Sequence, residues 1–326
     1  EYLFKAISFG LRINVMKKYT VGVDIGGGHI LSAIVDNTNN QLLAETKSYV
    51  KVNNKGTFEQ IMTSWSTALN ESIKHIDSND LEGIGFAMPG AFNYKDGIGM
   101  FEEGNKKYLA LYQVNIKKAL TPYLDIAHEI PFRYLNDATA FAVGEAWLGK
   151  AKDASKSIAV TLGTGLGSAF IDQGVPVVVR EDVPKEGCLW HLPFKEGLVD
   201  DYFSTRWFTI TYEQRFGKKV AGAKELADMA KDSPEIMALF EEFGNNLGEM
   251  FTPWLKKFPA EVIVMGGNIT GAFNLFGPTM LSYFEKQSIK TRVEISDLME
   301  DSALLGSTRL FEEAFWNSVK DQLPTL

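Results

Sequence analysis

The chain has 326 residues, of which 45% are hydrophobic and 23% are charged. This is the balance of an ordinary soluble protein, with enough length for two domains. A formal net charge of −8 disfavours DNA or RNA binding, because an acidic surface repels phosphate backbones. The single cysteine, Cys188, excludes an internal disulfide and a cysteine-rich zinc site, and the four histidines have no metal-ligand spacing. We therefore expect a reducing, cytoplasmic setting.

The first 14 residues are mildly apolar, but they lack a continuous apolar core and a small-residue cleavage site. They therefore predict neither a signal peptide nor a membrane span. Met16, just before the first predicted strand, resembles a natural start. We assign no function to the residues that precede it.

The first structured segments predict a hairpin, a helix and a buried strand. Two apolar strands, at residues 20–25 and 30–35, are separated by three glycines at 26–28. Apolar residues at helical spacing follow over residues 57–76. A buried strand is then predicted at residues 83–88, where Pro89-Gly90 ends it.

The same order recurs later in the chain. Residues 157–161 and 168–171 predict two strands joined by a glycine-rich turn at 162–167, and a strand at 261–265 ends in two glycines. The chain thus predicts two diverged copies of one α/β unit, which form two lobes around a cleft. Residues 302–319 predict a helical stretch that packs back on the first lobe.

Both glycine turns are candidate phosphate sites. Glycines let the backbone approach a phosphate and expose amide N–H groups to it, and Asp24 before Gly26-Gly27-Gly28 could hold a hydrated Mg²⁺. A tight hairpin turn with a solvated aspartate is the alternative. The second turn contains Gly163-Thr164-Gly165; it lacks a Walker lysine, and a strand follows it where a Rossmann turn needs a helix. Two such turns in two copies favour the phosphate interpretation.

Two further motifs have a structural and a chemical interpretation. Asn136-Asp137 precedes an apolar helical stretch, so either residue could be its N-cap. Alternatively, Asp137 is a carboxylate that accepts the proton of a substrate hydroxyl during phosphoryl transfer. Gly266-Gly267, after a buried strand, could seat a nucleoside or form a simple strand-to-helix turn.

Taken together, these motifs resemble the ROK family (repressors, open reading frames and kinases) of the hexokinase/actin-like superfamily. The resemblance extends from Lys17 onward and rests on five segments: Val23–Gly27, Met88–Gly90, Asn136–Ala138 with Gly144-Glu145, Leu162–Gly167 and Val264–Gly267. It implies the two-lobed actin-like (ribonuclease H-like) fold. The N-terminal lobe would contain residues 17–134 and a C-terminal helix at 311–326, and the C-terminal lobe residues 135–310.

The resemblance also implies roles for single residues. Asp137 would be the general base, with Asn136 beside it and Asn105 as sugar contacts. Asp24 would meet the Mg²⁺ of ATP through water. The ATP phosphates would contact the residues of the first two glycine turns, which are Gly26, Gly27, Gly28, Gly163, Thr164 and Gly165. The nucleoside would lie by Gly266 and Gly267.

Three departures from the family pattern affect the site. Gly28 stands where a Thr or Ser hydroxyl is usual, and Cys188 stands where Gly-Glu-x-Gly-His has its sugar-binding Glu. Glu186 or Glu181 is the candidate replacement, while His191 keeps the family's His and is either a sugar contact or a core residue. The family's zinc-binding cysteine cluster is replaced by residues 194–206, so we predict no zinc.

We therefore expect an ATP- and Mg²⁺-dependent, glucokinase-like enzyme that phosphorylates a hexose or N-acetylhexosamine, and we expect a homodimer. Gly28 and Cys188 favour one alternative, a non-catalytic sugar-binding sensor on the same scaffold. A second alternative, a transcriptional regulator of the family, is disfavoured because few residues precede the first strand and the chain is acidic.

Overall fold

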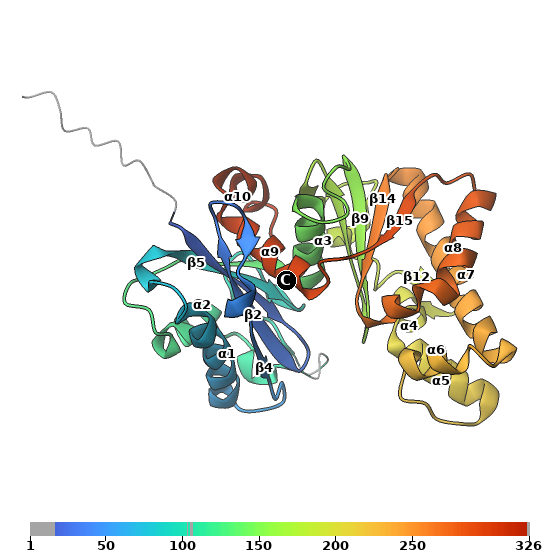
Figure 1. Ribbon diagram of the computed structural model, residues 1–326, viewed down its shortest axis with the longest axis horizontal. Coiled ribbons are helices and arrows are strands. Elements are labelled where there is room, and N and C mark those ends of the chain that lie inside the picture. Colours follow the sequence, from blue (N-terminus) through green and yellow to red (C-terminus); the bar gives the residue numbers. More distant parts are fainter. Residues whose placement is uncertain (1–16, 103, 105–106, 325–326) are drawn as a thin grey trace, which may run out of the picture.

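Two mixed β-sheets with the same strand topology form the framework of the protein. The computed structural model describes residues 17–102, 104 and 107–324. Asn105, a predicted sugar contact, lies outside these residues. Figure 1 shows one lobe around each sheet, with two helices between the lobes.

The first sheet has the order β3-β2-β1-β5-β8, with β4 paired to β2. Its central strand β1 is antiparallel to β2 and parallel to β5, which is parallel to β8. Most residues of β1, β2 and β5 are buried, as expected for strands covered on both faces. The strands are β1 (Tyr19–Ile25), β2 (His29–Asp36), β3 (Gln41–Leu42), β4 (Ser48–Lys51), β5 (Leu81–Met88) and β8 (Phe132–Asn136).

The second sheet repeats this arrangement in the order β11-β10-β9-β14-β15. Strand β9 is antiparallel to β10 and parallel to β14, which is parallel to β15. The strands are β9 (Lys156–Leu162), β10 (Leu166–Asp172), β11 (Val175–Pro176), β14 (Val262–Gly266) and β15 (Arg292–Ile295). The predicted hairpins, the predicted duplication and the two-lobed α/β fold are thus confirmed.

Two small hairpins and ten helices complete the described part of the chain. The hairpins are β6 (Phe92–Asn93) with β7 (Ile98–Gly99) and β12 (Pro193–Phe194) with β13 (Gly197–Leu198). The helices are α1 (Phe58–Ile73), α2 (Ile116–Leu120), α3 (Asp137–Trp147), α4 (Val199–Tyr202), α5 (Thr205–Phe216), α6 (Ala223–Met229), α7 (Pro234–Lys257), α8 (Phe273–Lys286), α9 (Glu300–Thr308) and α10 (Glu313–Val319). None of these helices combines the length and the apolar character that crossing a membrane requires.

Local sequence explains where α1 begins. The Thr57 side chain accepts a hydrogen bond from the Gln60 N–H, and the Gln60 side chain accepts one from the Thr57 N–H, which is a capping box. The helix predicted over residues 57–76 is thereby confirmed. The stretch predicted to be helical over residues 302–319 is instead divided between α9, a 3₁₀ turn at Arg309–Phe311 and α10.

Helices α3 and α9 cross between the two sheets (Figure 1). Helix α9 packs on β1 and β5, whereas α3 packs on β9 and β10. Glycines permit this close approach: a Cβ on Gly22 of β1 would lie 2.6 Å from the Leu304 carbonyl oxygen. The predicted boundaries between the two lobes, at residues 134/135 and 310/311, stay predictions. Helices α3 and α9 pack against each other between the lobes, so they do not mark where one lobe ends.

Candidate active site

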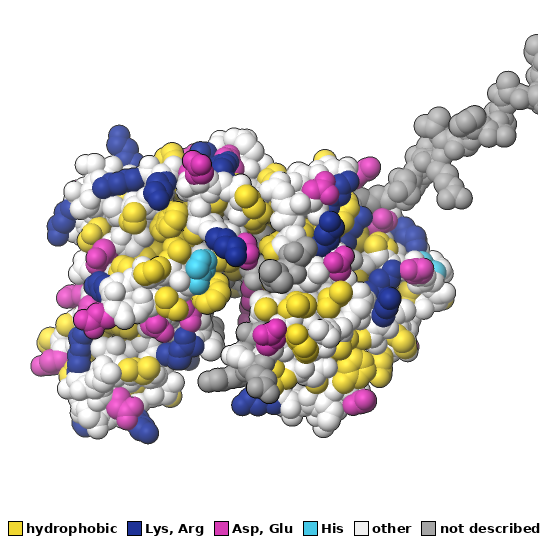
Figure 2. Space-filling view, turned by 180° about the vertical axis from the view of Figure 1, so that it is seen from behind, with side chains coloured by type: hydrophobic (Ala, Val, Ile, Leu, Met, Phe, Trp, Pro, Cys, Tyr) yellow, Lys and Arg dark blue, Asp and Glu magenta, His cyan; other side chains and the backbone are white. Residues whose placement is uncertain are grey.

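A cleft of about 900 Å³ lies between the lobes. Seen from behind, the molecule is hollowed where the two lobes meet (Figure 2). Both glycine turns contribute to the lining, together with the start of α3, residues of the segment 186–190, and residues near the end of α10. The duplicated fold therefore brings motifs that are far apart in the sequence to one cavity.

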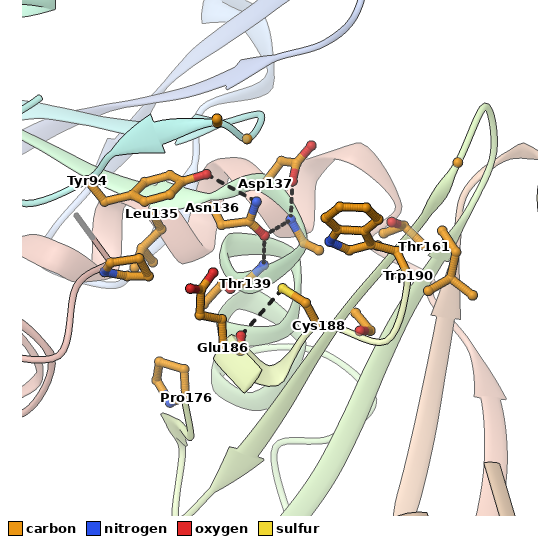
Figure 3. Close-up of a pocket in the computed structure, with 18 of the residues that line it drawn as sticks. Tyr94, Leu135, Asn136, Asp137, Thr139, Thr161, Pro176, Glu186, Cys188 and Trp190 are labelled. Carbon is orange, nitrogen blue, oxygen red and sulfur yellow. Dashed lines mark hydrogen bonds between the residues drawn. The ribbon is translucent and has the colours of Figure 1, made fainter. Parts of the chain in front are cut away.

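Asn136, at the end of β8, is the N-cap of α3. Its Oδ1 accepts hydrogen bonds from the N–H groups of Ala138 (3.1 Å) and Thr139 (3.3 Å), and its Nδ2 donates to the Tyr94 hydroxyl (3.2 Å). Asn136 thus provides the cap for which the sequence offered two candidates. Asp137 is the first residue of α3 and lines the cleft beside it (Figure 3).

Burial raises the pKa of the Asp137 carboxyl above its ordinary value. A hydrogen bond from the Ala138 N–H (2.8 Å) and the positive charge of Lys107 oppose this shift. Asp24, at the end of β1, has its pKa raised to about 7 by burial and by the negative charges of Asp137 and Glu300. The two carboxylates therefore interact, although Asp24 is not among the residues that line the cleft.

In the first turn, the three carbonyl groups point toward protein donors. Tyr108 Oη donates to the Gly26 oxygen (2.7 Å), Asn54 Nδ2 to the Gly27 oxygen, and the Val52 N–H to the Gly28 oxygen (2.9 Å). Gly27 and Gly28 line the cleft, and a Cβ added to either would meet nothing within 4 Å. The turn thus leaves open space that a phosphate group could occupy.

The second turn faces the same cleft from the other lobe. Thr164 and Gly165 line the cavity, and the Gly163 N–H donates to the Gly165 oxygen (3.1 Å) within the turn. A Cβ on Gly163 would also meet nothing within 4 Å. The two turns therefore offer the close backbone approach that a nucleotide phosphate chain needs.

One wall of the cleft contains Cys188, which departs from the family pattern, and Glu186, its candidate replacement. Glu186 has φ 59° and Gly187 has φ 70°, and this left-handed pair bends the chain so that both Glu186 and Cys188 line the cleft (Figure 3). Of the two candidate replacements, Glu186 is the one in the lining, whereas Glu181 is exposed and lies outside it. Burial, followed by the charge of Glu186, raises the pKa of the Cys188 thiol to about 12.

Of the predicted site residues that the structure describes, six lie outside this lining: Asp24, Gly26, Gly163, His191, Gly266 and Gly267. The His191 ring packs edge-on against Trp190, with ring centroids 5.3 Å apart, and only Trp190 lines the cleft. Gly266 is buried at the end of β14, and Gly267 follows with φ 86° against the Leu162 carbonyl oxygen. Their proposed contacts with sugar and nucleoside stay predictions.

The structure adds residues that the sequence motifs did not indicate. Tyr94, Lys107 and Trp190 line the cleft, as does Pro324, whose carbonyl oxygen accepts a hydrogen bond from the Tyr94 N–H (2.9 Å). They come from loops and from the segment after α10, where no periodicity or motif marks them. Only the position of Trp190, one residue before His191, gave a local signal.

The residues that the structure describes contain no group of three or more His, Cys, Asp or Glu side chains that could hold a metal ion. Asp24 and Asp137 are close enough for the negative charge of Asp137 to raise the pKa of Asp24. Such a pair suits an ion whose other ligands come from substrate phosphates and water, as is usual for Mg²⁺.

The repeated sheets and the cleft between them define a two-lobed α/β protein of the actin-like class. The sequence profile of the ROK family matches residues 20–180, a stretch that contains both glycine turns and Asn136-Asp137. The resemblance inferred from the motifs is thus confirmed.

Similar proteins cover part or nearly all of the chain. A glucokinase from Thermotoga maritima is 23% identical over 320 residues, which are 90% of this chain and 97% of that protein. An N-acetyl-D-glucosamine kinase from Vibrio cholerae is 26% identical over 153 residues, 41% of this chain and 51% of that protein. The crystal structure of a ROK family glucokinase from Streptomyces griseus, in complex with glucose and AMPPNP, has a TM-score of 0.70 at 22% identity and covers 90% of this chain and 98% of its own.

Proposed function

We propose that this protein transfers the γ-phosphoryl group of ATP to a hydroxyl of a hexose or N-acetylhexosamine. The observation that carries the proposal is the convergence of Asp137 and two open glycine turns on one cleft. Phosphoryl transfer needs a proton acceptor for the attacking hydroxyl and a site that positions and neutralises the phosphates. The similar glucokinases and N-acetyl-D-glucosamine kinase support this reaction and this class of substrate.

Asp137 is the proposed general base. Its carboxylate would accept the proton of the sugar hydroxyl as that oxygen attacks the γ-phosphorus and the bond to ADP breaks. Because burial raises its pKa, the carboxylate is a stronger base than an exposed aspartate. The fixed Asn136 cap holds Asp137 at the start of α3 and could itself contact the sugar.

The phosphates of ATP would bind across the two turns, at the backbone N–H groups of Gly27, Gly28, Thr164 and Gly165. Mg²⁺, when bound with ATP, would neutralise the developing charge, and Asp24 is the residue proposed to hold it through water. Glu186 is the proposed acceptor for sugar hydroxyls in place of the missing family Glu. Gly266 and Gly267 remain candidates for the nucleoside, and His191 and Asn105 for the sugar.

We further propose that the protein acts in the cytoplasm as a homodimer. The single cysteine and the absence of a membrane-crossing helix among the described residues are compatible with this setting. Dimerisation is proposed from the family resemblance alone, and the molar mass in solution tests it directly.

The test is ADP release with Mg²⁺-ATP across a panel of hexoses and N-acetylhexosamines. We expect sugar-dependent turnover that falls by about 10²–10⁴-fold in Asp137→Asn, because this variant keeps the shape of the side chain but loses the proton acceptor. Sugar binding measured by calorimetry should persist in the variant. If wild-type protein binds a sugar without turning over ATP, the kinase proposal is wrong and the sensor alternative is correct.

A further inference from the structure

The second glycine turn is held by residues within the segment 194–206, which replaces the family's zinc cluster. Asp200 belongs to α4, and Thr205 and Arg206 begin α5. All three form hydrogen bonds to the backbone of the turn between β9 and β10.

Asp200 is at the centre of this arrangement. Its Oδ1 accepts a hydrogen bond from the Leu166 N–H (2.7 Å), and its Oδ2 accepts one from Arg206 Nη2 (2.5 Å). Its own N–H donates to the carbonyl oxygen of Trp190 (3.1 Å), which lines the cleft. One residue therefore fixes the glycine turn to the wall that contains Cys188 and Trp190.

The carbonyl groups of the turn are also bound. The Gly163 oxygen accepts hydrogen bonds from the Thr205 N–H (2.8 Å) and Oγ1 (2.9 Å), and the Thr164 oxygen accepts one from Arg206 Nη1 (3.2 Å). Among the residues that the structure describes, the N–H groups of Thr164 and Gly165 have no hydrogen-bond partner. The arrangement thus leaves two amide donors available to a phosphate, while the carbonyl oxygens, which would repel it, accept hydrogen bonds from the protein.

Gly165 is required for this contact. A Cβ at this position would lie 2.8 Å from Asp200 Oδ1, closer than a side chain can approach. The carboxylate therefore lies directly against the turn, where its negative charge would repel nucleotide phosphates. The guanidinium of Arg206 pairs with it and cancels that charge.

We infer that Asp200 and Arg206 are positioning residues for the nucleotide phosphates, Asp200 by fixing the turn and Arg206 by binding Thr164 and neutralising Asp200. This inference rests on the proposed function. It assigns to residues 200–206 the task of holding the phosphate turn without a metal ion.

Binding of AMPPNP with Mg²⁺, and separately of the sugar found in the turnover panel, tests the inference by calorimetry. Arg206→Ala should weaken AMPPNP binding roughly tenfold to hundredfold, because a charged hydrogen-bond donor is lost and Asp200 is left unpaired. Sugar affinity should change less than about twofold, since only the phosphate turn is disturbed. Arg206 is 51% exposed, so its truncation removes little packing.

The double variant Asp200→Asn/Arg206→Ala separates positioning from mere structural support. Asparagine keeps an acceptor for Leu166 and removes the unpaired charge, so AMPPNP affinity should partly recover relative to Arg206→Ala. Arg215→Ala is the matched control: Arg215 lies on the same helix, is 45% exposed and forms a 2.7 Å ion pair with Glu242. It should bind AMPPNP as the wild type does.

Each outcome has a distinct meaning. If the wild type binds no AMPPNP, the proposed function fails. If the wild type binds AMPPNP and Arg206→Ala binds it equally well, the positioning role is wrong. Equal loss of nucleotide and sugar binding, or no recovery in the double variant, would show a general structural role and also overturn the inference.

Discussion

At the scale of single residues, the cleft combines acidic groups whose charges are unfavourable in isolation. Burial raises the pKa of both Asp137 and Asp24, and the negative charges of Asp137 and Glu300 raise the pKa of Asp24 further. Lys107 lowers the pKa of Asp137 in opposition to burial, which helps to keep the proposed base ionised. A base with a raised pKa, kept ionised by a nearby cation, suits proton abstraction near neutral pH.

The Cys188 thiol should react slowly with alkylating reagents. Its pKa is raised to about 12, so at pH 8 far less thiolate is present than in an ordinary thiol. We expect iodoacetamide to modify native Cys188 on the order of 100-fold more slowly than a free thiol, because greater thiolate nucleophilicity only partly offsets the lower thiolate fraction. Mass spectrometry of timed samples gives the rate directly, since the chain has a single cysteine.

Protein unfolded in urea is the control, and it should react at the rate of a free thiol. The native rate should rise with pH through pH 9–10 without levelling off, because the group remains protonated there. A native rate equal to that of the unfolded chain would mean that the cleft wall does not bury Cys188.

Local sequence predicted those site residues whose chemistry depends on a local motif. The glycine turns and Asn136-Asp137 belong to this group, since each is a turn or cap within a few residues. The choice between Glu186 and Glu181 depended on a left-handed backbone at residue 186, which a glutamate rarely adopts and which the sequence does not signal. Lys107 reaches the cleft through tertiary packing, so no local pattern could place it.

At the scale of elements, the strands and their turns were predictable because both copies show the same alternation of apolar strand and glycine turn. The break within residues 302–319 was not predictable from the sequence. Helix α9 is followed by a 3₁₀ turn, and Glu312 then has extended backbone angles before α10 begins. No proline or glycine marks that break, and packing on the first lobe determines it instead.

The crossing of α3 and α9 depends on glycine at residue 306. A Cβ there would overlap the carbonyl oxygen of Ala140 on α3 and would also lie 2.8 Å from the Gly144 N. Because this obstacle is backbone, Gly306→Ala should destabilise the protein by about 2 kcal/mol or more, as overpacked cores do. Urea unfolding measures the loss, with the slope of the transition expected to stay unchanged.

Gly271→Ala is a suitable comparison, because a Cβ at Gly271 would meet nothing within 4 Å. This variant should unfold within about 0.5 kcal/mol of the wild type. Equal stability of Gly306→Ala and Gly271→Ala would show that the two helices are not in the close contact described above.

At the scale of the whole molecule, the hydrophobic residues form two main clusters. One spans the first sheet and includes residues of β9, β10 and β14, and the other lies around the second sheet. The cleft lies between the lobes, and the closely packed pair α3 and α9 joins them. Two rigid bodies joined in this way are expected to move by rotation about the helix pair, with little change within each lobe. Sequence duplication predicted the lobes, but it contains no information on the angle between them.

Substrate binding should close the cleft. Water that reached the γ-phosphate could be phosphorylated in place of the sugar, so a kinase of this shape gains from excluding it.

A compact protein of this length has a radius of gyration of about 20 Å, and the open two-lobed molecule should exceed that value. We expect small-angle X-ray scattering to show a smaller radius of gyration when the sugar identified by turnover and AMPPNP are both present. A sugar that gives no turnover is the control and should leave the scattering curve unchanged. If the productive sugar binds in calorimetry and the radius stays constant, the lobes do not close, and water must be excluded by the cleft residues themselves.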